Sequence, residues 1–190
     1  MDRGDMNVLE TSIADVLIVE PKLIGDARGF FVEMYQSDRY ETSGIKPRFV
    51  QDNLSHSAAG VLRGLHFQNP KPQGKLVTVL KGAVLDVAVD VRVGSPTFGN
   101  HVAVELNSEN RRQLWIPRGI AHGFMVLSET ADFFYKCDEF YSPLDELVLL
   151  WNDPALGIDW GCASPTLSAR DKAGRTLAQL DGLLPIYDQR

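Results

Sequence analysis

The sequence predicts an all-β protein, folded as a cupin-type jelly-roll barrel or sandwich with short peripheral helices, and two observations predict it. Short runs rich in β-branched and aromatic residues recur along residues 15–151, and Gly, Pro, Asn or Asp separates them. Helical patterns are confined to two short segments. Many short strands with turn residues between them favour a barrel or sandwich over a fold that alternates strands with helices.

Eleven runs are expected to form strands because each is short, apolar and bounded by turn residues. In chain order they are 15–21, 29–35, 48–53, 61–67, 75–80, 83–91, 101–106, 112–117, 122–127, 132–137 and 146–151. Lys81-Gly82 joins two of these runs, which predicts an antiparallel hairpin. Segments 37–44 and 168–180 are expected to be helical, with Ser37 capping the first segment and Gly44 ending it.

No internal repeat, low-complexity tract or linker interrupts the chain, which predicts a single domain over residues 1–190. The barrel core is expected over roughly residues 48–152, with N- and C-terminal extensions packing on it.

The composition limits which kinds of partner the protein is expected to bind. A formal net charge of −6 disfavours nucleic-acid binding, although a local cluster of Arg and Lys can still bind a small anionic ligand. No apolar run reaches the length of a membrane span, and no N-terminal leader pattern is present. Cys137 and Cys162 fit no metal spacing, so reduced thiols and a cytoplasmic location are expected.

Acidic residues interrupt one of the most apolar runs, at 83–91. Strict alternation places Leu85, Val87 and Val89 on one face and Asp86 and Asp90 on the other. An acid among such neighbours is expected either at a barrel mouth or paired with a cation.

The run at 61–67 raises a question of register. Regular alternation would place Arg63 and His66 on opposite faces of the strand. A β-bulge at Gly64 would bring both side chains to the same face, and bulges often lie beside active sites.

Several kinds of chemistry are disfavoured. A metal-binding barrel would need a second histidine near His66, but Gln68 occupies that position and His122 is far along the chain. Neither a glycine-rich nucleotide loop nor a GxSxG nucleophile motif is present. We therefore expect no metal and no cofactor. The remaining His, Lys, Arg and Tyr residues suit proton transfer next to a carbonyl group.

Ten segments together resemble the dTDP-4-dehydrorhamnose 3,5-epimerase family in order and spacing, from about Val8 to Asp171. They are GDARGFF (25–31), FVQDNLS (49–55), GVLRGLHFQ (60–68), QGKLV (73–77), DVAVDVR (86–92), SPTFG (95–99), RQLWIPRGIAHGF (112–124), VLSETADFFYK (126–136), WNDPALGIDW (151–160) and LSARD (167–171). The resemblance implies a metal-free cupin-type barrel, usually a homodimer. It also implies inversion of C3 and C5 in dTDP-4-dehydro-6-deoxy-D-glucose, giving dTDP-4-dehydro-L-rhamnose.

The resemblance also implies residue roles. His66 resembles the general base with Asp171 as its partner, Tyr135 the proton donor on the opposite face, and Lys75 the residue that stabilises the enolate oxygen near Asp86. Residues that resemble the substrate-binding set are Arg28, Phe30, Glu33, Gln51, Asp52, Asn53, Arg63, Gln68, Lys75, His122, Glu146 and Arg170. Taken alone, Tyr135 fits a half-buried strand aromatic and Phe30 a core residue.

Two positions depart from the family pattern. Arg170 stands where lysine is frequent, and Leu54 where histidine is frequent. Neither is a catalytic position, so they bear on substrate preference. Two alternatives stay open: a relative that inverts only C3 or only C5 of a related sugar, and a barrel that binds sugar nucleotides without catalysis. Retention of the four catalytic types argues against the second.

Overall fold

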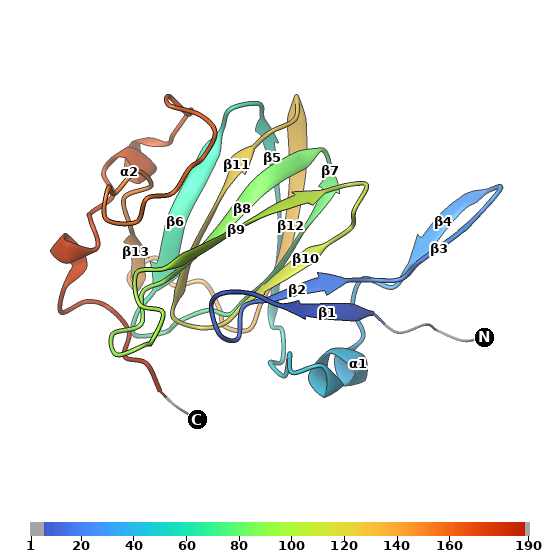
Figure 1. Cartoon of the computed structure of the whole chain (residues 1–190), viewed down its shortest axis with the longest axis horizontal. Helices are drawn as coiled ribbons and strands as arrows, with labels where there is room; N and C mark the ends of the chain where they lie inside the picture. The colour runs from blue at the N-terminus through green and yellow to red at the C-terminus, as the bar shows by residue number, and fades with distance from the viewer. Residues whose placement is uncertain (1–5, 189–190) are drawn as a thin grey trace.

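The computed structural model describes residues 6–188, and most of its regular structure is β (Figure 1). One sheet has six strands in the order β1-β2-β10-β7-β12-β5, and another has five in the order β13-β6-β11-β8-β9. All neighbouring strands in these sheets are antiparallel. The predicted all-β class with short helices is confirmed.

The strand bounds follow the order of the sheets. The six-stranded sheet contains β1 (Asn7–Glu10), β2 (Leu17–Glu20), β10 (Gln113–Ile116), β7 (Lys75–Lys81), β12 (Thr130–Cys137) and β5 (Gln51–Ala58). The five-stranded sheet contains β13 (Glu146–Val148), β6 (Leu62–Gln68), β11 (Ile120–Val126), β8 (Ala83–Asp90) and β9 (His101–Asn107). A separate hairpin of β3 (Leu23–Asp26) and β4 (Gly29–Val32) extends away from both sheets (Figure 1).

Three apolar clusters hold the layers together. The first fills the space between the two sheets and includes Val77 and Phe133 from one sheet and Ala88 and Phe124 from the other. The second packs the outer face of the five-stranded sheet against the C-terminal segment, which carries α2 (Ala169–Lys172) and the 3₁₀ turn η1 (Ala178–Leu180). The third packs α1 (Ser37–Thr42) on the six-stranded sheet.

Each of the eleven predicted runs contains or overlaps a strand, but two strands were not predicted. β1 and β3 are short and largely exposed, so they lack the apolar alternation that marks a half-buried strand. The predicted helical segment 168–180 contains only α2 and η1, separated by an irregular stretch.

The hairpin predicted at Lys81-Gly82 is wrong, because β7 and β8 belong to different sheets. Gly82 has a φ of +79°, and a Cβ at this position would lie 2.1 Å from the carbonyl oxygen of Thr130. The turn therefore carries the chain from one sheet to the other at a point where only glycine fits.

The predicted N-cap of α1 is also wrong by one residue. Gln36 is the N-cap, and its side-chain oxygen accepts the Arg39 N–H at 2.8 Å. Gly44 follows the C-cap with a φ of +92°, as expected for a residue that ends a helix. Among residues 6–188, no helix is both long and apolar enough to cross a membrane.

The predicted irregularity at Gly64 is confirmed. Along β6 and β11, His66 is opposite His122 and Arg63 is opposite Phe124, so Gly64 and Leu65 together face the single residue Gly123. The extra residue changes which side chains point outward. Leu62, Leu65 and Phe67 all lie in the outer cluster with the C-terminal segment, and Arg63 and His66 share the other face.

Candidate active site

A histidine–aspartate pair lies at one end of the space between the sheets. His66 Nε2 is 2.6 Å from Asp171 Oδ1, and Ser168 holds the other carboxylate oxygen with a hydroxyl hydrogen bond of 2.8 Å. Ser168 is the N-cap of α2, and its oxygen also accepts the Asp171 N–H at 3.1 Å. The same cap that begins the helix therefore fixes the carboxylate against the imidazole.

The charge of Asp171 decides the tautomer of His66. Burial raises the pKa of the Asp171 carboxyl, but the hydrogen bonds from His66 and Ser168 lower it more, so the pKa lies below its ordinary value. An ionised carboxylate has no proton to donate, so Nε2 carries the hydrogen of this bond. In the neutral ring, the lone pair is then on Nδ1.

Glu146 of β13 lies near this second nitrogen. Its Oε1 is 3.8 Å from His66 Nδ1, and its Oε2 accepts the Tyr141 hydroxyl at 2.7 Å and pairs with the Arg170 guanidinium. Arg170 also donates to the Tyr141 oxygen at 3.3 Å. Glu146 therefore links the histidine to a cation and a phenol at the edge of the pocket.

Tyr135 faces this group from the other sheet. It lies on the inner face of β12, packed against the core between the sheets, with its ring 6.0 Å from that of Phe133. Burial, with Cys137 and Glu146 nearby, raises the pKa of its phenol, and the Arg63 guanidinium partly offsets this. The phenol is therefore protonated at neutral pH.

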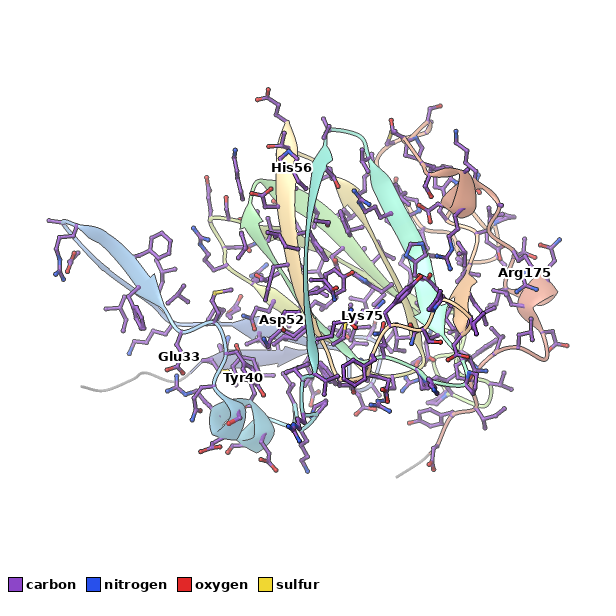
Figure 2. The ribbon with its side chains drawn as sticks, turned by 180° about the vertical axis from the view of Figure 1, so that it is seen from behind. Glu33, Tyr40, Asp52, His56, Lys75 and Arg175 are labelled. Atoms are coloured by element: carbon purple, nitrogen blue, oxygen red, sulfur yellow. The ribbon has the colours of Figure 1, made fainter. Side chains whose placement is uncertain are left out.

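Lys75 is the first residue of β7 and lies near Cys137, Glu146 and Asp86, and the two acidic side chains favour its ammonium form. Burial is the larger effect and lowers the pKa of the Lys75 ammonium. Within residues 6–188, no hydrogen bond or ion pair is formed by its ammonium group. Lys75 lies in the interior, well away from Glu33 and Tyr40 near α1 (Figure 2).

Asp86, which was expected either at a barrel mouth or paired with a cation, is fully buried in β8. Its two oxygens lie 2.9 and 3.1 Å from His122 Nε2, and the His122 ring stacks on Phe133 at 5.9 Å. The structure thus pairs Asp86 with His122, and Asp86 also contributes to the electrostatic environment of Lys75.

Other predicted binding residues lie around the same space. Arg63 Nε donates to Ser57 Oγ at 3.0 Å, which links β6 to β5 of the opposite sheet. Gln51 accepts the Tyr141 N–H at 2.9 Å and donates to Asn53 at 3.0 Å. These contacts place Gln51 and Asn53 on the pocket side of β5.

Five predicted or singled-out residues lie elsewhere. Asp52 and Leu54 are on the outer face of β5, where Asp52 pairs with Lys136 and Leu54 is 64% exposed. Arg28 and Phe30 belong to the extended hairpin, and Glu33 pairs with Arg39 at 3.0 Å beside α1. None of the five is brought to the His66 pocket of its own chain.

Gln68 lies near the site, but its side-chain amide is already hydrogen-bonded within the chain. Its nitrogen donates to the carbonyl of Lys71 at 2.8 Å, and its oxygen accepts the Ser142 N–H at 2.9 Å. The side chain therefore connects the Lys71 backbone to the loop that carries Tyr141, and both ends of its amide group are hydrogen-bonded within the chain.

Tyr141 and Ser168 were missed by the sequence analysis. Tyr141 follows β12 in an irregular segment, whose N–H groups at Tyr141 and Ser142 donate to the side-chain oxygens of Gln51 and Gln68. A sequence pattern carries no signal for such a position, although Ser168 three residues before Asp171 fits the N-cap spacing.

No group of three or more His, Cys, Asp or Glu side chains within residues 6–188 is arranged to hold a metal ion. Neither Cys137 nor Cys162 forms a disulfide.

A family model described as dTDP-4-dehydrorhamnose 3,5-epimerase matches residues 10–179. A protein of that description from Salmonella typhimurium is 55% identical over 177 residues, which covers 92% of this chain and 97% of the relative. A dTDP-4-dehydrorhamnose 3-epimerase from Streptomyces niveus is 41% identical over 186 residues, with coverage of 96% and 90%.

Among solved structures, a dTDP-6-deoxy-D-glucose-3,5-epimerase from Legionella pneumophila superposes with a TM-score of 0.94 and 54% identity. The match covers 96% of this chain and 99% of that one, and that protein is in complex with dTDP-4-keto-L-rhamnose.

Proposed function

The chain belongs to the dTDP-4-dehydrorhamnose 3,5-epimerase family, and on that premise we propose how its pocket inverts C3 and C5 of dTDP-4-dehydro-6-deoxy-D-glucose. Its activity is that of an isomerase acting on a nucleotide-linked sugar. Both carbons are next to the C4 ketone, which makes their protons acidic. The observation that carries the proposal is that His66 and Tyr135 face the same space from opposite sheets.

His66 acts as the base through Nδ1. Asp171 fixes the ring through Nε2, so Nδ1 is the nitrogen with a free lone pair. The proton leaves C3 or C5 for Nδ1, and the electron pair of the C–H bond moves into the enolate at C4.

Lys75 stabilises the charge that develops on the C4 oxygen. Its ammonium has no internal hydrogen-bond partner within residues 6–188, so it is free to donate to the enolate. A cation in a buried site is worth far more to a developing oxyanion than the same cation in water.

Tyr135 returns a proton from the opposite face of the sugar. Its raised phenol pKa keeps the O–H intact until the enolate forms. The carbon then takes the phenolic proton, its configuration is inverted, and the phenolate and the protonated His66 are reset by exchange with water. Removal and delivery from opposite faces require two groups, and two facing sheets supply them.

Arg63, Arg170, His122, Gln51, Asn53 and Glu146 are the residues of this chain that we assign to binding the sugar nucleotide. Arg63 and Arg170 provide positive charge for its diphosphate, so local basicity overrides the acidic average of the chain. No metal ion or cofactor takes part in this scheme.

We further propose that two copies of the chain form a homodimer and that the hairpin serves the partner's pocket. Arg28 is 89% exposed at the side chain and Phe30 is 52% exposed, far from their own His66. Beside the hairpin, a groove of about 470 Å³ on the six-stranded sheet is lined by Val32, Leu76, Phe134 and others, next to exposed Leu54. An apolar face of this kind is typical of an interface.

Mixing two inactive variants tests this arrangement. If Arg28 acts in the partner's pocket, chains with His66→Ala and chains with Arg28→Ala regain activity when mixed, because one pocket of the mixed dimer has both residues. Activity that stays at the level of the separate variants, or a monomer by light scattering, would contradict the proposal.

A cytoplasmic location also belongs to this proposal, and the unpaired Cys137 and Cys162 support it.

The second candidate is inversion at C3 alone, favoured by the 41% identity to the Streptomyces niveus 3-epimerase. The higher identity to the Salmonella relative supports double inversion. Proton NMR of the substrate with enzyme in D₂O distinguishes them. Deuterium at both C3 and C5 is expected, and deuterium at C3 alone would overturn the double inversion.

A further inference from the structure

Lys75 lies at the end of a strand, where the backbone hydrogen bonding of the sheet stops. It is the first residue of β7, opposite Cys137, which is the last residue of β12. Strand ends fray unless they are tied down, and a lysine side chain adds four rotatable carbons of its own. A cation that must meet an enolate oxygen needs a fixed starting point.

One carboxylate closes this strand end. Asp138 follows β12, and its Oδ1 accepts the Gly74 N–H at 2.6 Å while its own N–H donates to the Gly74 carbonyl at 3.1 Å. The two bonds extend the β7–β12 ladder by one residue beyond Lys75. The Asp138 side chain is only 4% exposed, so its charge is held inside the structure.

Arg118 supplies the matching charge. Its Nε donates to Asp138 Oδ2 at 2.9 Å, and its Nη2 donates to the Asp138 carbonyl at 3.1 Å. Arg118 belongs to the turn between β10 and β11, so the pair ties three separate chain segments together at the base of Lys75. A buried carboxylate with one neutral donor alone would be costly, and the guanidinium offsets that cost.

Gly74 is shaped for this contact. A Cβ at position 74 would lie 2.8 Å from Asp138 Oδ2 and 2.7 Å from the Trp115 ring. The carboxylate can approach the Gly74 backbone only because no side chain is present there.

We propose that Asp138, held by Arg118, is a positioning residue for Lys75: it fixes the backbone from which the ammonium enters the pocket. The inference rests on the role of Lys75 proposed above. The side chain of Asp138 bonds to Gly74 and Arg118 and not to His66, so the proposed effect runs through the strand end that carries Lys75. A loss of Asp138 therefore lowers turnover through the enolate step and leaves nucleotide binding intact.

The first experiment compares three variants by steady-state kinetics and by deuterium exchange. Asp138→Ala is expected to lower kcat and the exchange rate by about tenfold with KM within about twofold, since only transition-state stabilisation is lost. Asp138→Asn keeps an oxygen acceptor for Gly74 and is expected to restore kcat to within about threefold of wild type. Asp132→Ala, at the other end of β12, is the matched control and keeps full kcat.

If Asp138→Ala does not fold, Arg118→Ala takes its place, because the Arg118 side chain is 47% exposed and its loss frees the carboxylate. A kcat lowered by about threefold with unchanged KM is then expected. Unchanged kcat in the variant that folds, a fall explained by KM alone, or an Asp138→Asn variant as slow as Asp138→Ala overturns the proposal.

A double-mutant cycle separates this proposal from the role of Lys75. In a Lys75→Ala background, Asp138→Ala is expected to have no further effect on the exchange rate, because the group it positions is absent. An equal loss in both backgrounds shows that Asp138 does not act through Lys75. Full activity of Lys75→Ala alone shows instead that the proposed enolate stabilisation is wrong.

Discussion

His66 and His122 are opposite one another on adjacent strands, and each ring is bonded to an aspartate through Nε2. The two pairs nevertheless differ in access. The His122 and Asp86 side chains are 8% and 0% exposed, whereas the His66 side chain is 28% exposed beside a 5% exposed Asp171. The His122–Asp86 pair is therefore inaccessible from outside, whereas His66 of the His66–Asp171 pair is partly accessible.

The difference in exposure between the two pairs indicates which of them can exchange protons with a ligand. His122 is enclosed by the core between the sheets. Its pair with Asp86 joins neighbouring strands of one sheet, and its stacking on Phe133 contacts the other sheet. His66 is held from one side only, and its Nδ1 is directed toward Glu146 and the pocket. A third pair, His56 with Asp132, is at the surface with 64% and 33% exposure and serves as a control.

The largest expected effect separates His66 from the surface pair. His66→Ala is expected to lower both deuterium exchange and epimerisation by about 10⁴-fold, because no enolate forms without the base. His56→Ala is expected to leave both rates unchanged. Proton NMR in D₂O measures the two processes together. Substantial exchange in His66→Ala would assign the base to another group.

A smaller and asymmetric effect is expected for Tyr135→Phe. Net inversion falls by about 10²-fold, since the proton donor on the far face is lost. Exchange falls less, because His66 still forms the enolate and returns a deuteron to the same face. The ratio of exchange to inversion is read from one NMR time course. Equal loss of exchange in Tyr135→Phe and His66→Ala would make Tyr135 necessary for enolisation itself.

The two aspartates are expected to respond differently to the same substitution. Asp171→Asn lowers kcat by roughly tenfold or more with little change in thermal stability, because the orientation and tautomer of His66 are no longer fixed. Asp86→Asn lowers the free energy of unfolding by about 1–3 kcal/mol, because a fully buried partner of His122 is impaired. Kinetics and chemical denaturation measured on both variants would refute the contrast if the two profiles were alike.

The smallest effect is a shift in the alkaline limb of the pH profile. Burial lowers the pKa of the Lys75 ammonium from 10.5, whereas the phenol pKa of Tyr135 is raised from 10.0. We therefore assign the alkaline limb to Lys75, so that kcat falls as its ammonium loses its proton, at a pH below the ordinary range for lysine. Lys75→Arg is expected to move this limb upward, since a guanidinium stays charged. An unmoved limb would assign it to a different group.

Much of the fold could be predicted because its information is local. Alternating apolar residues marked the half-buried strands, and Gly64 between Arg63 and His66 indicated the bulge that the pairing of β6 and β11 shows. Sheet membership could not be predicted in this way. The Lys81-Gly82 turn contains residues typical of a hairpin, yet the chain crosses from one sheet to the other there. The sheet to which β7 belongs is set by its long-range pairing with β10 and β12.

The site residues likewise could be predicted where the sequence signal is local, and could not be predicted where tertiary contacts decide. Asp86 was expected either at a barrel mouth or paired with a cation, and its hydrogen-bond partner in the structure is His122, 36 residues away in the sequence. Gln68 was expected to bind substrate, but its amide is used by the backbone of the 138–142 loop. Tyr141 was missed, because only tertiary hydrogen bonds bring it to Glu146. Contacts between loops leave little trace in local sequence.

The bulge in β6 changes which residues of the strand face the space between the sheets. Before it, odd-numbered residues face the space between the sheets, and after it even-numbered residues do, so Arg63 and His66 share one face. Two glycines permit the slip: a Cβ on Gly64 would lie 2.5 Å from Gly123 Cα, and a Cβ on Gly123 would lie 2.7 Å from the Arg63 carbonyl oxygen. If the full-length strand kept regular alternation through residues 62–67, without the bulge, the two surfaces of its downstream half would be exchanged. Phe67 would then occupy the pocket, and His66 would be turned into the apolar layer beneath the C-terminal segment.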